Sequence, residues 1–165
     1  MDAYEKIEAI IAEKYERDGK TTRKAVGDFM MSDNHAVNVK SNNVEKQNYS
    51  PNLISIKKMH EWVFEEKKDI SFVFVDYKVV GDKLEIVAET PLTPIETISW
   101  DCLSIEAQGY GVIQKIGGLI VIEGQTKCEF YKGFLKEYGR FRDKENRKHE
   151  KFSRKFIKDP ETIDW

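Results

Sequence analysis

Two strand-like runs on either side of a tight turn, within residues 27–43, constrain the fold of this chain more than any other feature. The turn is the cluster Ser32-Asp33-Asn34-His35, whose residue types favour a reversal of the backbone. In Ala36-Val37-Asn38-Val39-Lys40 apolar and polar residues alternate, so Asn38 and Lys40 project from one face of a strand and the valines from the other. The pattern predicts a β-hairpin with one face in a core.

Asp28 places a charge inside the first run, after Val26 and before Phe29. Burial of an unpaired charge is costly, and a metal ion or a nearby Lys40 would offset that cost. The hairpin brings Asp28, Asn38 and Lys40 to one edge. A carboxylate, a second oxygen ligand and a lysine can hold Mg²⁺ and activate a water against a phosphodiester. The alternative is an ordinary amphipathic hairpin in which Asp28 forms a salt bridge and Lys40 reaches solvent.

These residues resemble the active-site motif of the PD-(D/E)XK phosphodiesterases, and within them the small Type II restriction endonucleases. Gly27-Asp28 stands where the family has Pro-Asp, and Asn38-Val39-Lys40 stands where it has (Asp/Glu)-X-Lys. Nine residues separate Asp28 from Asn38, which is a PvuII-like spacing. The resemblance implies that Asp28, Asn38 and the Val39 carbonyl bind Mg²⁺ and that Lys40 orients or deprotonates the attacking water.

The sequence departs from the family at Asn38, which replaces the second carboxylate. Asn offers a carbonyl oxygen to Mg²⁺ but no charge. Some restriction-like enzymes draw a Glu from the helix before the first strand, and Glu8, Glu13 and Glu16 are candidates here, with Glu13 preferred. Asp33 is a further candidate, although it is predicted to lie at the turn, away from the edge. The remaining interpretation is an inactive site.

The order of elements around the hairpin predicts an α/β fold with a restriction-endonuclease-like core, a mixed β-sheet flanked by helices. The core covers about residues 2–90 of a single nuclease domain spanning 1–165, and residues 91–165 form a DNA-contacting, accessory part. The predicted elements are a helix at 2–18, a helix at 51–67 capped by Ser50 with Pro51 in its first turn, and strands at 70–77 and 84–88.

Two polar segments are candidates for reading DNA, because amide and hydroxyl side chains suit phosphate and base contacts. The first follows Lys40 directly, and the second combines glycines with glutamines. The predicted contacts are Ser41, Asn42, Asn43, Gln47, Asn48, Tyr49 and Ser50 in the first segment and Gln108, Gln114 and Lys115 in the second. The alternatives are a surface loop for the first and, for the second, a hairpin of 112–116 with 119–122 around Gly117-Gly118.

The C-terminal segment from Lys132 to Lys158 is strongly basic. It holds eleven Lys or Arg and four Asp or Glu, a local charge of +7, which leaves 16 basic and 25 acidic residues, or −9, in the rest of the chain. Such polarisation favours an anionic partner, and Arg140 and Arg142 are predicted to contact DNA. Helical spacing of the aromatic residues from Phe130 to Phe141 predicts a helix with a core-facing side. A merely solvated helical face is the alternative.

Composition excludes several classes of protein. No apolar run approaches the roughly 18 residues of a membrane-spanning helix, and the first six residues lack the basic start and apolar block of a signal peptide. The two cysteines, Cys102 and Cys128, are typical of reduced thiols, so a cytoplasmic location is expected.

The predicted function is a Mg²⁺-dependent, sequence-specific endonuclease of double-stranded DNA, a Type II restriction enzyme. Cutting both strands of a symmetric target favours a homodimer. The alternatives are a structure-specific repair nuclease or resolvase, and a catalytically silent DNA-binding domain.

Overall fold

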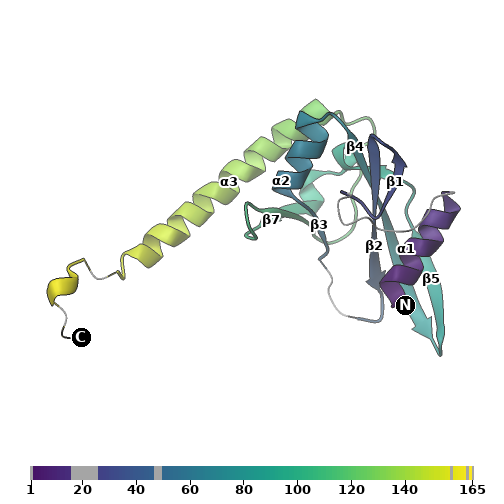
Figure 1. The fold of residues 1–165 in the computed structure, drawn as a ribbon, viewed down its shortest axis with the longest axis horizontal. Helices are drawn as coiled ribbons and strands as arrows, with labels where there is room; N and C mark the ends of the chain where they lie inside the picture. The colour runs from purple at the N-terminus through teal and green to yellow at the C-terminus, as the bar shows by residue number, and fades with distance from the viewer. Residues whose placement is uncertain (1, 16–25, 47–49, 157, 163, 165) are drawn as a thin grey trace.

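The computed structural model describes residues 2–15, 26–46, 50–156, 158–162 and 164. These residues form a mixed α/β fold with two β-sheets (Figure 1). Its elements are α1 (Ala3–Lys14), β1 (Phe29–Ser32), β2 (His35–Asn43), β3 (Asn52–Ser55), α2 (Ile56–Met59), a π-helical turn (His60–Glu65), β4 (Asp69–Val80), β5 (Lys83–Glu89), β6 (Thr93–Pro94), β7 (Leu103–Glu106), β8 (Val112–Lys115), α3 (Lys127–Ser153) and 3-10 turns at Ile95–Thr97, Trp100–Cys102 and Pro160–Thr162.

The larger sheet has the strand order β1-β2-β4-β5, and β6 pairs with β4. The predicted hairpin forms β1 and β2, which are antiparallel and joined at Asp33-Asn34. The chain then crosses through β3 and α2 and returns as β4, which lies parallel to β2 from His35 opposite Asp69 to Asn43 opposite Tyr77. β5 pairs back antiparallel to β4. A mixed sheet flanked by helices is therefore confirmed.

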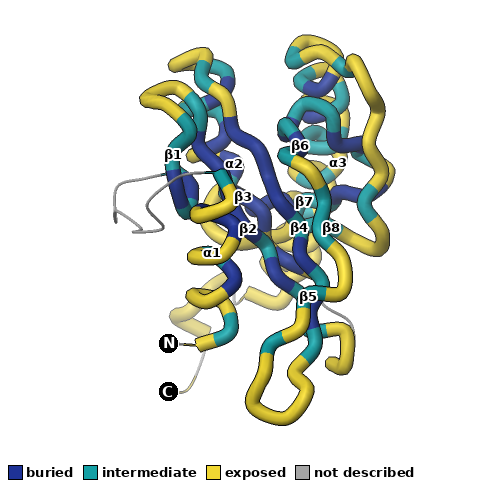
Figure 2. Tube along the Cα trace, turned by 90° about the vertical axis from the view of Figure 1, so that its right-hand side faces the viewer, coloured by how far each residue is buried: buried dark blue, intermediate teal, exposed yellow. Residues whose placement is uncertain are grey.

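Residues of β2 belong to two different hydrophobic cores, and much of the strand is buried (Figure 2). Val37 and Val39 pack with Ile7 and Ile11 of α1 on one face of the larger sheet. Ala36 belongs to the core on the other face, which also takes in α2, the first half of α3 and the smaller sheet β3-β8-β7. The alternation expected from the sequence thus places β2 between two packed layers.

The predicted helix at 51–67 is wrong in its first part. Residues Asn52–Ser55 are the strand β3, which pairs antiparallel with β8, and the helix begins only at Ile56. Its N-cap is Ser55, whose Oγ accepts the Lys58 N–H at 3.2 Å, whereas Ser50 is exposed and caps nothing. Leu53 and Ile54 are both buried, so their apolar run fits a buried strand as well as a helix, and pairing with β8 decides the outcome.

The alternative interpretation of the second polar segment, a hairpin of 112–116 with 119–122, is also wrong. β8 pairs with β3 and β7, and the stretch after Gly117-Gly118 contributes only an isolated bridge between Val121 and Ile98. The other predicted strands are confirmed with longer bounds in β4 and β5. None of the helices in the described part of the chain is long and apolar enough to cross a lipid bilayer.

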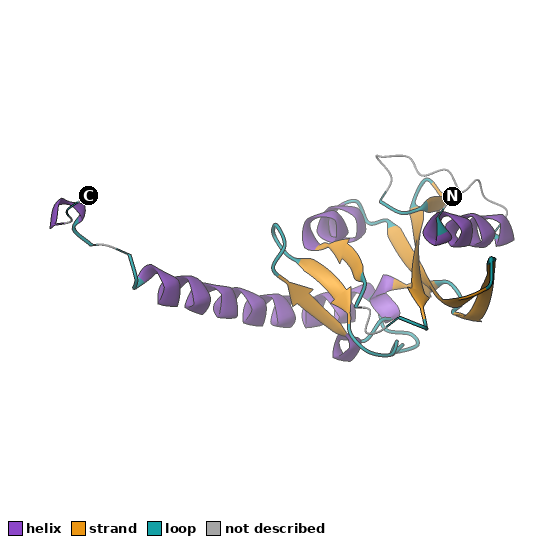
Figure 3. Ribbon diagram, turned by 90° about the horizontal axis from the view of Figure 1, so that it is seen from below, coloured by secondary structure: helices purple, strands orange, loops and turns teal. Residues whose placement is uncertain are grey.

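The N-cap of α3 is Thr126, whose side chain accepts the Glu129 N–H, and the first half of the helix packs against β7 and the turn around Trp100. Phe130 and Phe134 are buried, which confirms the predicted helix with a core-facing side. The second half extends away from the body of the molecule (Figures 1 and 3).

Two glycines in α3 should respond oppositely to alanine. A Cβ at Gly133 would lie 2.5 Å from Cδ1 of Trp100, whereas a Cβ at Gly139 has no atom within 4 Å. Gly139→Ala should raise the free energy of unfolding by about 0.5–1 kcal/mol, because alanine favours helix. Gly133→Ala should lower it by about 1–3 kcal/mol, because the Trp100 ring must move. Urea denaturation of both variants checks this, and equal stabilisation would show that Trp100 does not pack on Gly133.

Candidate active site

Asp28 is held at the point where β1 and β2 separate. Its backbone N–H donates to the Val37 carbonyl at 2.8 Å, and its Oδ2 accepts the Val39 N–H at 2.6 Å. The carboxylate thereby takes the place of a neighbouring strand on the open edge of β2. Gly27 makes this approach possible, because a Cβ there would lie 2.6 Å from the Val37 oxygen. The motif that this stretch resembles has a proline at this position; a proline carries a Cβ and would not fit here, so this chain requires glycine.

Asn38 and Lys40 project from the face of β2 opposite to α1, as the alternation predicts. Asn38 is only 8% exposed, and its Nδ2 donates to the Val26 carbonyl at 3.4 Å. Because Nδ2 donates to Val26, the amide oxygen is the atom of this side chain that can bind a cation. Asn38 therefore occupies the predicted second position of the site without supplying a charge.

The charges of Asp28 and Lys40 are both penalised by burial. Burial raises the pKa of Asp28, opposed by the Val39 N–H and by the Lys40 ammonium. Burial likewise lowers the pKa of Lys40, opposed by Asp28 and Glu8. A carboxylate and a lysine that affect each other's pKa in a partly desolvated place are typical of functional sites.

Of the candidate glutamates of α1, Glu8 is the one whose pKa is affected by Asp28 and Lys40. Burial raises the pKa of Glu8 to about 7, with a further increase from Asp28 and a decrease from Lys40. Glu13 is exposed. It follows Glu8 by five residues, which corresponds to a rotation of about 140° around the axis of α1, so the two side chains point in different directions. The sequence-based preference for Glu13 is therefore not supported. Glu16 lies outside the described residues, and Asp33 is exposed at the turn, away from the edge.

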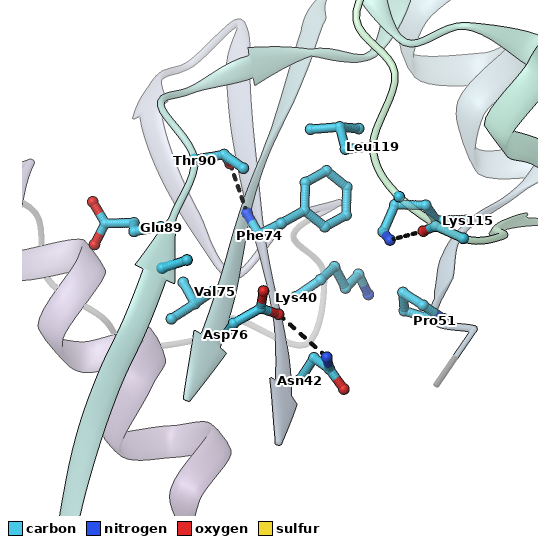
Figure 4. A pocket seen from close by; sticks show the side chains of 13 residues that line it. Lys40, Asn42, Pro51, Phe74, Val75, Asp76, Glu89, Thr90, Lys115 and Leu119 are labelled. Atoms are coloured by element: carbon cyan, nitrogen blue, oxygen red, sulfur yellow. Dashed lines mark hydrogen bonds between the residues drawn. The ribbon is translucent and has the colours of Figure 1, made fainter. Parts of the chain in front are cut away.

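Lys40 also lines a cleft of about 380 Å³ between the two sheets (Figure 4). Lys115 of β8 enters the same cleft from the opposite wall, with its Nζ 5.5 Å from the centre of the Phe74 ring and donating to the Gly117 carbonyl at 2.7 Å. Two ammonium groups from different sheets therefore face one cleft. This arrangement suits an extended anionic ligand.

Asp76 lines this cleft and was not predicted from the sequence. The parallel register places it beside Asn42, whose Nδ2 donates to Asp76 Oδ1 at 3.2 Å. Its only signal in the sequence is a charge at the end of the apolar run 70–75. The pairing of β2 with β4, which follows a long crossover, is what brings Asp76 to the site.

The predicted DNA contacts after Lys40 do not form one surface. Asn42 lines the cleft, whereas Ser41 is 3% exposed and faces the α1 side of the sheet, where its hydroxyl has no partner among the described residues. Asn43 accepts the Glu45 N–H at 3.0 Å and so stabilises the turn after β2. Ser50 is exposed, and Gln47, Asn48 and Tyr49 lie outside the described residues.

The second polar segment is divided in the same way. Gln114 and Gln108 bond to Asn52, at 2.7 Å and 3.4 Å, and form an exposed amide cluster. Because neighbouring residues of a strand point to opposite faces, Gln114 lies away from the cleft that Lys115 enters. Arg140, which pairs with Glu137 at 2.9 Å, and Arg142 both lie on α3, outside the cleft.

The donor set at the site fits a hard cation that keeps part of its water shell. Among the described residues no group of three or more His, Cys, Asp or Glu side chains is placed to hold a metal. Glu8 and Asp28 are, however, two carboxylates whose charged forms are disfavoured by burial and, at Glu8, by the proximity of Asp28. A divalent cation between them would neutralise both. Mg²⁺ typically binds through one or two carboxylates and several waters, so these residues fit it.

No protein-family model matches this sequence, and no curated protein is significantly similar to it. The resemblance to the PD-(D/E)XK phosphodiesterases is a resemblance of the motif residues alone. Any function of the protein therefore depends on the chemistry of the site.

The raised pKa of Glu8 predicts a pH dependence of stability. Its pKa is about 7 in the folded protein against an ordinary 4.5, so the native state binds more protons between these values. The free energy of unfolding must then fall as the pH rises through this window. Allowing for solvent screening, we expect the loss between pH 5 and 8 to be about 1 kcal/mol larger in the unmodified protein than in Glu8→Gln.

Urea denaturation at several pH values measures this difference. Glu13→Gln, an exposed glutamate of the same helix, is the matched control and should keep the pH dependence of the unmodified protein. Parallel curves for Glu8→Gln and Glu13→Gln would show that Glu8 does not lie in the site as described.

Proposed function

We propose that this protein is a Mg²⁺-dependent phosphodiesterase that cuts double-stranded DNA. More specifically, we propose a sequence-specific endonuclease of the Type II restriction class. The observation that carries the proposal is that the buried Asp28 carboxylate, held on the Val39 N–H, affects the pKa of both Glu8 and Lys40. The antiparallel β1-β2 pair followed by a crossover to the parallel β4 supports a restriction-endonuclease-like core.

Each residue of the site has a distinct chemical role in this proposal. Asp28, Glu8, the Asn38 amide oxygen and the Val39 carbonyl would hold the ion, which when bound polarises the phosphate and its attacking water. Lys40, whose pKa is lowered by burial, is suited to accept a proton from that water or to orient it. In its charged form it stabilises the additional negative charge of the transition state.

The cleft between the sheets supports binding of a polynucleotide strand. Lys115 faces Lys40 across it, and the flexible ammonium of a lysine can pair with a phosphate next to the one that is cut (Figure 4). Cutting both strands of a symmetric target would call for a homodimer, since the described part of one chain holds one such site.

The test is incubation of the purified protein with plasmid and viral genomic DNA, with Mg²⁺ or with EDTA. Discrete fragments that appear only with Mg²⁺ support the sequence-specific enzyme. A smear or nicking alone favours a structure-directed or nonspecific nuclease on the same site. Intact DNA under all conditions contradicts the nuclease.

A catalytically silent DNA-binding domain is the second candidate, because Asn38 supplies no charge where the family has a carboxylate. Glu8 weakens this alternative, since it brings a second carboxylate to the site from α1. Intact DNA together with retardation in a gel would favour the silent domain.

A further inference from the structure

The second half of α3 lies outside both hydrophobic cores. From Arg142 to Ser153 every residue is exposed except Glu145, and the helix extends away from the body (Figures 1 and 3). A helical segment of this length is marginally stable in water without a packed face. Its polar surface is therefore the part of the molecule that is most available to a partner.

Most basic residues of α3 from Lys136 onward lie in one stripe. At 100° per residue, an arc of about 120° holds six cationic side chains and a single acidic one, Glu137, which pairs with Arg140 at 2.9 Å. The stripe, named the basic stripe below, consists of Lys136, Arg140, Lys144, Arg147, Lys148 and Lys151. Lys132 and Arg142 lie outside this arc, so Arg142, which the sequence predicts to contact DNA, is not part of the stripe and is expected to make no phosphate contact.

Most of the basic stripe has no acidic partner. Among the described residues, Lys136, Lys144, Arg147, Lys148 and Lys151 have no carboxylate within 4 Å. The stripe also borders a groove of about 590 Å³ between α3 and β7, where Arg140, Lys144 and Lys148 form one wall. The acidic side chains in this groove have partners: Glu106 accepts from Ser104, Glu137 pairs with Arg140 and Glu145 with His149.

We infer that the basic stripe is a binding surface for the phosphate backbone of duplex DNA, separate from the cleft at Lys40. The six cations extend over about 22 Å of helix. One strand of DNA presents about six phosphates over the same length. This inference deepens the proposed function, on which it rests for the identity of the polyanion, and it assigns to α3 a sequence-independent hold on the substrate.

The test compares two double variants that remove the same charges. Arg147→Gln with Lys151→Gln changes the stripe, and Lys132→Gln with Arg142→Gln changes the flanks of α3. Binding of each full-length protein to a fluorescent 30-base-pair duplex is measured in EDTA over a range of NaCl concentrations. EDTA prevents cleavage, so the measurement does not depend on catalysis.

Loss of two phosphate contacts should reduce the slope of log K against log salt by about 1.8 and weaken binding at 0.1 M salt on the order of 50-fold. The flank variant should keep the slope of the unmodified protein. Equal changes in both variants, or none in either, would overturn the inference, because only net charge would then matter. A stripe variant that loses self-association in sedimentation but keeps its salt slope would also overturn it, in favour of a second copy as the occupant.

The outcome separates this inference from the proposed function. DNA that is bound through the stripe but never cut with Mg²⁺ leaves the stripe assigned and contradicts the nuclease. DNA that is cut with Mg²⁺, together with a salt slope that the stripe variant does not change, supports the nuclease and overturns the assignment of the stripe.

Discussion

Lys40→Met should reduce Mg²⁺-dependent cleavage of DNA by at least about a thousandfold while DNA binding changes by only a few fold. Methionine keeps the apolar stem of the side chain and removes the ammonium that faces Asp28 and the cleft. The size of the loss follows from the combined effects of proton transfer and charge stabilisation in the transition state. Binding should persist because Lys115 and α3 are unchanged.

The variant should also unfold at a higher urea concentration than the unmodified protein. Burial lowers the pKa of Lys40 even in the presence of Asp28 and Glu8, so its charged form costs stability at neutral pH. Lys78→Met is the matched control, a lysine on β4 that pairs with Glu85 at 3.8 Å, and it should leave cleavage unchanged. Equal cleavage by both variants would remove Lys40 from the mechanism.

Asp28→Asn should abolish metal-dependent cleavage to a similar extent and stabilise the folded protein. Asparagine has the same shape, and its Oδ1 can still accept the Val39 N–H, so the hairpin is kept while the charge is lost. Burial raises the pKa of Asp28 despite Lys40, which means that its carboxylate costs free energy at neutral pH. Because the pKa of Asp28 is raised in the folded state, its protonated form adds to the free energy of unfolding. That contribution is lost as the pH rises through the raised pKa.

Cleavage assays over a range of Mg²⁺ concentrations and urea denaturation at pH 7 give the two readouts. Asp33→Asn, at the turn of the same hairpin, is the control and should change neither. A variant that loses both activity and stability would indicate that Asp28 serves mainly to hold the hairpin. A variant that is stabilised and still active would exclude it as a ligand.

The hairpin and its alternation could be predicted because they depend on local sequence. The period of two in Ala36–Lys40 fixed which side chains face α1 and which face the cleft, and turn residues marked the reversal at Asp33. The choice among the helix glutamates could not be made this way. Glu8 and Glu13 differ by a rotation around α1, and which of them faces Asp28 depends on how α1 packs on the sheet.

The other features that could not be predicted from the sequence share one physical cause, which is pairing between segments that are distant in sequence. β3 is a strand because β8 pairs with it, and Asp76 reaches the cleft because β4 lies parallel to β2. The separation of Lys115 from Gln114 follows from the same pairing, since it decides which face of β8 lines the cleft.

The position of β2 between two cores has a consequence for how this protein can change. The strand that carries Asn38 and Lys40 is anchored on both sides, so its backbone amides should exchange with solvent more slowly than those of the second half of α3. Substitutions on that half of α3 can then tune how tightly a substrate is held without moving the reacting groups. Catalytic reactivity and substrate affinity can therefore be altered independently, by natural variation or by design.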